Sequence, residues 1–179
     1  MKTIPAALLA LLLNTHGLLA GEWWDSWKGD LRATWGSDRH SVILPVNTYH
    51  VRATYDKERI ENYNEIPWGL GVERFYVDAR ENRHSFYALA FAASYGHVQP
   101  VVGYSWEKSF FFDSAHATRL GVGYAAIITA RQQNAYIPFP GALPVLSFGY
   151  KSLSVQTSWV PYVERNYGNI FLTVVKFDL

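Results

Sequence analysis

The sequence predicts an all-β protein: an eight-stranded antiparallel β-barrel that spans a membrane and is preceded by an amphipathic α-helix. Three observations predict this fold. The N-terminus is typical of an export signal, large apolar residues alternate with small or polar ones in stretches of about ten residues, and no later segment is apolar for long enough to span a bilayer as a helix. Aromatic residues make up 16% of the chain and hydrophobic residues 49%.

The first element is a signal peptide over residues 1–20. Lys2 precedes an apolar stretch from Ala6 to Leu13, and the segment closes on Ala20, the small residue expected before a cleavage point. The alternative is a membrane anchor, but the apolar stretch is too short to span a bilayer as a helix. The chain is therefore predicted to be exported, leaving about 159 residues, enough for one domain.

Composition excludes several classes of function. Removing Lys2 with the signal leaves 15 basic residues against 15 acidic ones, so bulk charge would not hold a nucleic acid. The chain has no cysteine, which excludes disulfides, thiol nucleophiles and zinc–thiolate sites. His40, His84, His97 and His116 show no metal-ligand spacing. We expect neither a metal nor a cofactor.

An amphipathic helix is predicted over residues 21–37. Trp23, Trp27, Leu31 and Trp35 recur every four residues, with charged residues between them, and so form one aromatic face. Such a face suits a membrane interface, but it also suits a helix packed on the barrel end as a plug or clamp. A helix at the periplasmic rim would contact both the lipid and the barrel end.

The barrel is predicted over residues 38–179, and its clearest strand is Leu120–Arg131. Large apolar residues such as Val122, Tyr124 and Ile128 lie on one face of that strand, opposite small or polar ones. The other predicted strands are Thr48–Tyr55, Trp68–Val77, Tyr87–Ala92, Val101–Phe112, Leu143–Tyr150, Leu153–Val160 and Asn169–Leu179.

The faces of the strands favour a membrane barrel over a soluble lipocalin-like barrel, which would hold its large apolar residues inside. Small residues oppose the bulky ones, so we expect the bulky face outward in lipid and a narrow lumen. The residues predicted to point inward are Ala88, Ala90, Ala92, Gly103, Gly121 and Gly123. The alternating end of the chain, from Phe171 to Leu179, resembles the pattern recognised during outer-membrane insertion.

The inward face of the last strand is divided. Ile170, Leu172 and Val174 are apolar, whereas Lys176 and Asp178 are charged. A purely structural small barrel tends to fill its lumen with polar and charged side chains. The pattern predicts a dry slot for a hydrocarbon chain, although tight packing of the same side chains is the alternative.

Four prolines lie within or at the ends of the predicted strands. Pro45, Pro67, Pro144 and Pro161 each remove a ladder hydrogen bond, and unpaired backbone in a bilayer is costly. They indicate either two weakened seams, through which a lipid tail could enter the lumen sideways, or simply strand ends.

Several motifs resemble those of the lipid A palmitoyltransferases, the PagP family. They follow in the family's order across essentially the whole exported chain: Tyr49-His50, Tyr55-Asp56-Lys57-Glu58, Tyr63-Asn64-Glu65, Pro67-Trp68-Gly69, Tyr87-Ala88-Leu89-Ala90-Phe91, Gly103-Tyr104-Ser105-Trp106-Glu107, Thr129-Ala130-Arg131 and Tyr136-Ile137-Pro138. None of these motifs is specific alone, and Leu179 departs from the terminal Phe common in the family.

The resemblance implies a monomeric, multi-pass acyltransferase of the bacterial outer membrane. It would move a palmitoyl chain from an outer-leaflet phospholipid to a hydroxyacyl group of lipid A in lipopolysaccharide, and it would be inserted by the outer-membrane insertion machinery. Two alternatives remain: a non-catalytic lipid-binding or structural barrel, and a hydrolase such as a deacylase or phospholipase. A free fatty acid product would identify the hydrolase.

The resemblance also implies the site residues. His50 matches the family's histidine and Ser94 its serine, but the family's aspartate is Ala93 here. Acyl transfer needs a base near the attacking hydroxyl, and neutral imidazole suits that role. Another group must then orient His50, and the candidates are Asp56, Glu65, Tyr95 and His97.

Two further roles follow from the resemblance. Pro45 with Pro67, and Pro144 with Pro161, match the family's two lateral openings. Ser105 takes the place of a glycine at the floor of the family's acyl-chain slot, so its side chain is expected to shorten the slot and to favour a donor chain somewhat shorter than palmitate.

Overall fold

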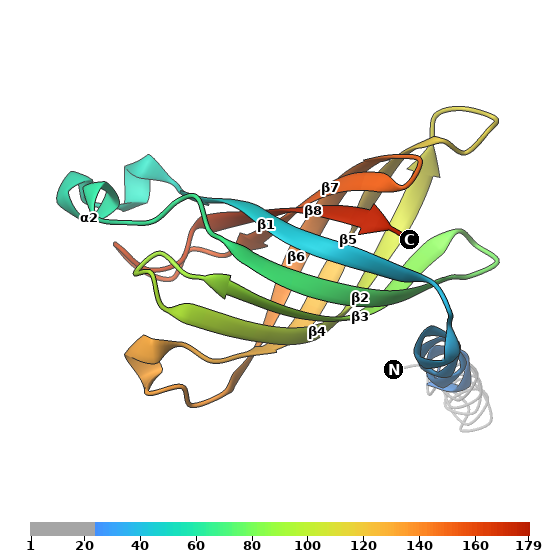
Figure 1. Ribbon diagram of the computed structural model, residues 1–179, viewed down its shortest axis with the longest axis horizontal. Helices are drawn as coiled ribbons and strands as arrows, with labels where there is room; N and C mark the ends of the chain where they lie inside the picture. Colours follow the sequence, from blue (N-terminus) through green and yellow to red (C-terminus); the bar gives the residue numbers. More distant parts are fainter. Residues whose placement is uncertain (1–23) are drawn as a thin grey trace, which may run out of the picture.

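The computed structural model describes residues 24–179, so the predicted signal peptide and the start of the predicted helix lie outside the described part of the chain. A helix over residues 24–36 precedes a closed barrel of eight antiparallel strands, which confirms the predicted fold (Figure 1). The strands are β1 (His40–His50), β2 (Gly69–Val77), β3 (Asn82–Ala92), β4 (Val98–Phe111), β5 (Thr118–Thr129), β6 (Phe139–Tyr150), β7 (Leu153–Val160) and β8 (Ile170–Asp178).

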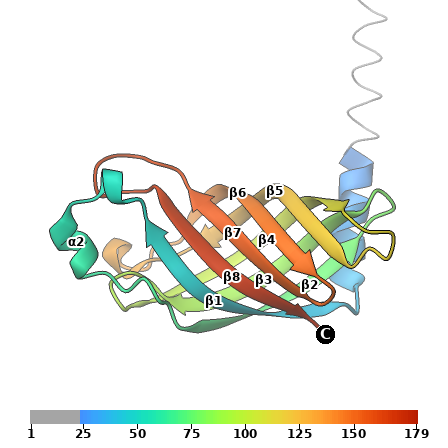
Figure 2. The same ribbon diagram turned by 90° about the horizontal axis from the view of Figure 1, so that it is seen from above.

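The barrel has two different ends, which we call the turn end and the loop end. The turn end holds the connections 78–81, 112–117 and 151–152, and the N-terminal helix and the C-terminus lie there (Figures 1 and 2). The loop end holds the connections 51–68, 93–97, 130–138 and 161–169. These include η1 (Arg52–Thr54), α2 (Lys57–Glu61) and η2 (Gln132–Asn134).

Strand β5 shows the alternation that the sequence predicts. Val122, Tyr124 and Ile128 are exposed on the outside, whereas Ala125 and Thr129 are buried in the lumen. A Cβ atom on Gly121 would lie 2.7 Å from the buried Glu107 carboxylate, so this glycine faces the lumen as predicted. An exposed apolar outer wall is the surface that a bilayer requires.

The prediction is wrong for the faces of β3. Ala88 and Ala90 are exposed outside the barrel, while Leu89 and Phe91 are buried in the lumen. The rule that small residues point inward fails here because the lumen beside β3 is itself apolar. Large apolar side chains can therefore face either the lumen or the outside of the barrel.

The predicted strand at Thr48–Tyr55 is also wrong beyond its third residue. Strand β1 ends at His50, and the chain turns through η1, where the Thr54 hydroxyl and its N–H both donate to the Val51 carbonyl at 2.9 Å. The real strand begins earlier, at His40, where the apolar run Val42-Ile43-Leu44 hides the alternation. The period-two pattern after His50 therefore belongs to a loop.

The lumen is divided as the last strand predicts. Its loop-end half is an apolar cluster of Ile43, Leu89, Phe91, Val101 and Val174. Its turn-end half is a network of buried charges, in which Arg83 Nη2 lies 2.9 Å from both Glu73 and Asp178, and Lys176 Nζ lies 2.6 Å from Glu73. Each of these charges has a partner, as burial requires.

Two seams of the barrel are incomplete toward the loop end. Strand β1 pairs with β2 only over His40–Ile43, although β1 continues through Pro45 to His50. Strand β6 pairs with β7 only over Val145–Tyr150, so Phe139–Pro144 has no partner in β7. Each unpaired stretch lies beside one of the two predicted pairs of prolines.

The N-terminal helix packs against the outside of the wall near the turn end. The Trp35 ring meets Phe86 edge-on at 5.9 Å, and Arg74 Nη1 donates to the Trp35 carbonyl at 2.5 Å. Trp35 is still 69% exposed, which leaves an aromatic surface beside the barrel. Within residues 24–179, no helix combines the length and apolar character needed to cross a membrane.

Candidate active site

His50 and Ser94 come together at the loop end. His50 is the last residue of β1 and is 1% exposed, and Ser94 follows β3 by two residues. Ser94 Oγ lies 2.9 Å from His50 Nε2, within hydrogen-bonding distance. The structure thus joins the two residues that the sequence selected 44 positions apart.

Glu65 lies on the other side of the imidazole. Its Oε1 atom accepts from the Nδ1–H of His50 at 3.0 Å and from the backbone N–H of His50 at 3.1 Å. A carboxylate can only accept, so Nδ1 carries the proton and Nε2 of the neutral ring is left to accept from Ser94. Glu65, His50 and Ser94 thus form a chain of hydrogen bonds, the arrangement that activates a hydroxyl in catalytic triads.

Arg52 holds Glu65 in place. Its Nη1 donates to Oε1 at 2.8 Å and its Nη2 to Oε2 at 2.5 Å, a forked pairing that fixes the carboxylate plane. This hydrogen bonding lowers the pKa of Glu65 to about 2, with His50 adding to the effect and partial burial opposing it. Glu65 is therefore ionised at any pH where the protein would work.

Aromatic side chains enclose the imidazole. The Tyr63 ring lies 4.5 Å from that of His50, and the Tyr55 ring meets it edge-on at 5.0 Å. The Tyr55 hydroxyl donates to the Gly168 carbonyl at 2.6 Å, and burial raises its pKa to about 12. Tyr55 is thus uncharged, and its hydrogen bond links the β1 side of the site to the loop before β8.

The other three candidates for orienting His50 lie elsewhere. Asp56 pairs with Arg165 and accepts from Asn166 at 2.6 Å. The Tyr95 hydroxyl lies 3.1 Å from that of Tyr63, and His97 accepts the Ala93 N–H through its backbone carbonyl. Glu65 is the one of the four with a hydrogen bond to the His50 ring.

A cavity of about 570 Å³ runs from this site into the lumen. That volume lies within the roughly 300–1,000 Å³ of small-molecule sites. His50 and Ser94 stand at its mouth, apolar residues line its middle, and Lys176 lies at its far end. The middle is lined by Ile43, Leu89, Phe91, Val101, Ile127, Leu143, Leu172 and Val174.

Ser105 lies beyond the wall of this cavity. It is 1% exposed, and its hydroxyl has no hydrogen-bond partner in the described part of the chain. Tyr87 lines the cavity, and its ring covers Gly103, where an added Cβ would lie 2.9 Å from it. Gly103 is the inward-facing position of β4 next to Ser105. The Tyr87 ring therefore covers the position that adjoins Ser105.

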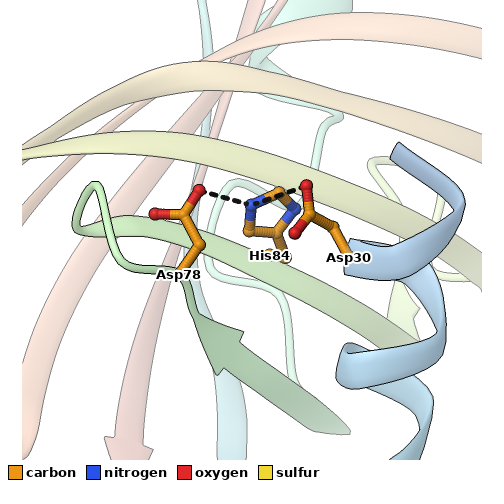
Figure 3. A group of neighbouring side chains, drawn as sticks. All are labelled: Asp30, Asp78 and His84. Carbon is orange, nitrogen blue, oxygen red and sulfur yellow. Dashed lines mark hydrogen bonds and ion pairs between the residues drawn. The ribbon is translucent and has the colours of Figure 1, made fainter. Parts of the chain in front are cut away.

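A second cluster of polar residues lies outside the wall near the turn end (Figure 3). His84 Nε2 is 3.3 Å from Asp78 and 3.9 Å from Asp30 of the N-terminal helix, and potential ligand atoms of the three lie within 4.8 Å of one another. His84 Nδ1 also bonds to the Tyr104 hydroxyl at 2.7 Å, and Asn82 donates to Asp78 at 2.7 Å. The hydrogen bonds of His84 and Asp78 link residues of the barrel to one another, and the ion pair of His84 with Asp30 adds a polar contact to the helix, at the opposite end of the barrel from His50.

The sequence profile described as "Antimicrobial peptide resistance and lipid A acylation protein PagP" matches residues 30–176. The chain belongs to the PagP family. Two relatives named "Lipid A acyltransferase PagP" show the extent of the similarity. The protein from Laribacter hongkongensis is 40% identical over 98% of this chain and 83% of its own length. The protein from Yersinia enterocolitica is 38% identical over 87% of this chain and 76% of its own.

The sequence predicted two residues of this candidate site, His50 and Ser94, and left the residue that orients His50 unranked. Glu65 was one of four candidates because nothing in the sequence places the loop after α2 against β1. The contribution of Arg52 was missed, because the predicted strand continued through it. Its position two residues after His50 was the available signal, since a residue that close can reach the same partner once the chain turns.

Proposed function

We propose that this chain is a lipid A acyltransferase of the bacterial outer membrane. It takes an acyl chain from an outer-leaflet phospholipid and transfers it to the hydroxyl of a hydroxyacyl group on lipid A. The observation that carries the proposal is a hydrogen-bonded His50–Ser94 pair at the mouth of an apolar lumen cavity. The names of the family's relatives support it.

His50 is the general base in this proposal. Its Nε2 takes a proton as a hydroxyl attacks the donor ester, and the imidazolium returns that proton to the lysophospholipid oxygen when the acyl–oxygen bond breaks. A positioned base of this kind contributes about 10²–10⁴-fold to the rate. Ser94 either donates to the developing oxyanion, after releasing Nε2 to the acceptor hydroxyl, or is itself the attacking hydroxyl. The contact of 2.9 Å serves both roles.

The cavity holds the transferred chain. A hydrocarbon tail would replace an empty apolar space, and each buried methylene contributes about 0.8 kcal/mol. We propose that Ser105, buried beside the position that the Tyr87 ring covers, limits the depth that the tail can reach. We therefore propose a donor chain of palmitoyl length or somewhat shorter.

The lipid tails enter through the two incomplete seams. Backbone that is unpaired toward a bilayer is expensive unless it serves a purpose. The stretch of β1 with Pro45, beside Pro67, forms one opening, and Pro144 with Pro161 forms the other. Both unpaired stretches extend toward the loop end, where His50 lies.

The outer wall supports a membrane location. Leu70 and Val72 of β2, Val102 of β4 and Leu146 of β6 are each at least half exposed. A soluble monomer would not leave so large an apolar belt uncovered. We propose that the barrel is inserted as a monomer by the outer-membrane insertion machinery, with the loop end facing outward.

The test is mass spectrometry of lipid A from a strain that lacks its own palmitoyltransferase, with and without this gene. Lipid A heavier by one acyl group, lost in His50→Ala, is the expected result, and its mass gives the chain length. Unchanged lipid A, with the barrel folded in the membrane, would overturn transferase activity. Free fatty acid without heavier lipid A would instead identify a hydrolase.

A further inference from the structure

We propose that Glu65 is the positioning residue that replaces the family's aspartate, and that Arg52 fixes Glu65 for this task. The inference rests on the proposed acyltransferase function. It concerns the residue that makes His50 a competent base in a chain whose residue before Ser94 is Ala93. Ala93 has no side-chain acceptor, so the orienting group must come from another segment.

The hydrogen bonds of Glu65 hold the His50 ring in a fixed position. Glu65 Oε1 accepts from two donors of one residue, the backbone N–H and the Nδ1–H of His50. Two bonds to one oxygen fix both the place and the plane of the ring. They also select the tautomer that leaves Nε2 free to accept a proton, which is the role of the carboxylate in hydrolytic triads.

The charge of Glu65 also favours proton uptake by His50. When Nε2 takes a proton, the imidazole becomes positive at a site that is almost completely buried, so it needs a negative partner. Glu65 is that partner, and its fork with Arg52 keeps it ionised and aligned. Although Arg52 adds a positive charge, Glu65 lies between it and the ring.

The loop that carries Glu65 is fixed to β1. The Glu65 carbonyl accepts from the Thr48 N–H at 2.9 Å and from Asn47 Nδ2 at 3.3 Å. These bonds occupy β1 where its pairing with β2 has already stopped. One residue therefore supports the open seam through its backbone and orients His50 through its side chain.

The test uses the full barrel purified in detergent, with a phospholipid donor and lipid A as acceptor. Glu65→Gln is expected to lower kcat at least about 10²-fold with little change in KM. An amide can turn its NH₂ toward Nδ1 and so favour the wrong tautomer. Glu65→Asp keeps the charge and is expected to recover at least tenfold over Glu65→Gln.

A pH profile separates positioning from a merely structural role. Besides Glu65, the groups that face the His50 ring are Tyr55, Tyr63 and Ser94, with Arg52 behind Glu65. A nearby carboxylate favours the protonated imidazole. Glu65→Gln should therefore move the acid limb of the rate–pH profile to lower pH, and loss of packing alone would not.

Asp56→Asn is the matched control, because Asp56 is also a loop carboxylate paired with an arginine but has no contact with His50. It is expected to keep kcat within about twofold. If wild type and Asp56→Asn transfer acyl chains and Glu65→Gln does so at an equal rate per folded protein, the inference is wrong and the function stands. If wild type transfers none, the proposed function fails first. Should Glu65→Gln not fold, an Asp variant no faster than Glu65→Ala would equally overturn the inference.

Discussion

The two halves of the lumen differ in the side chains that fill them. At the turn end, charged side chains fill the barrel and neutralise one another. Arg83 lies between Glu73 and Asp178, and Glu107 accepts from Ser147 at 2.5 Å and Gln156 at 2.8 Å. At the loop end, apolar side chains leave a cavity open below a polar site. The charged half is therefore expected to stabilise the barrel, and the loop-end half to carry the proposed function.

Breaking the charged half is expected to have the largest effect, and on stability. Arg83→Met leaves Glu73 and Asp178 without a shared partner, and breaking a buried ion pair costs about 3–5 kcal/mol. The measurement is urea unfolding of the barrel in phospholipid vesicles, followed by tryptophan fluorescence. The folded fraction should retain its activity.

Arg80→Met is the control for that experiment. Arg80 lies exposed in the turn between β2 and β3, where a substitution changes stability by about 0.5 kcal/mol or less. An equal loss in both variants would mean that the charged half does not stabilise the barrel more than its surface does.

Breaking the site at the loop end should do the reverse. Ser94→Ala is expected to lower kcat about 10²–10³-fold, as for loss of one oxyanion donor, without changing the urea midpoint. The rate per folded protein and the mass of the protein during turnover are the measurements. Total loss of activity, together with an acyl adduct on wild type that Ser94→Ala lacks, would assign Ser94 as the nucleophile instead.

The sequence predicted the charged half of the lumen and the candidate site with different completeness. The alternation of β5 and the switch from Val174 to Lys176 on β8 were readable because a strand has one period and two environments. The end of β1 was not, because a loop after His50 happens to alternate. The reversed faces of β3 were not either, since both of its environments accept large apolar residues.

The third member of the site was out of reach for a different reason. His50 and Ser94 could be matched to family motifs, but the contact of Glu65 with His50 depends on how the loop 51–68 folds back on β1. Loop placement follows from tertiary hydrogen bonds such as Thr48 N–H to the Glu65 carbonyl, which have no local sequence pattern.

Weakening the forked hydrogen bonds between Arg52 and Glu65 is expected to make activity at the loop-end site depend on pH. Arg52→Gln removes the main cause of the low pKa of Glu65, about 2, and that pKa should rise toward its ordinary value. In wild type the contribution of the Glu65 carboxylate to activity is fully present above its ordinary pKa, and it is lost only as pH falls through about 2. The variant should start to lose it near pH 5, so a loss of about fivefold at pH 7 should grow to about tenfold at pH 4.5, where half of the Glu65 carboxylate is protonated. A deficit independent of pH would contradict the role of the fork.

The smallest expected effect lies at the boundary between the two halves. Ser105→Gly removes a buried hydroxyl that has no partner in the described residues and opens space beside the Tyr87 ring. If Ser105 limits the depth of the cavity, the preferred donor chain should lengthen by about one methylene, a roughly fourfold change in relative rate at 0.8 kcal/mol. Competition between donors that differ by single methylenes measures it, with Ser109→Gly, two inward positions deeper among the charges, as control. An unshifted optimum would mean that Tyr87 alone closes the cavity, because its ring already separates the apolar half from what lies beneath.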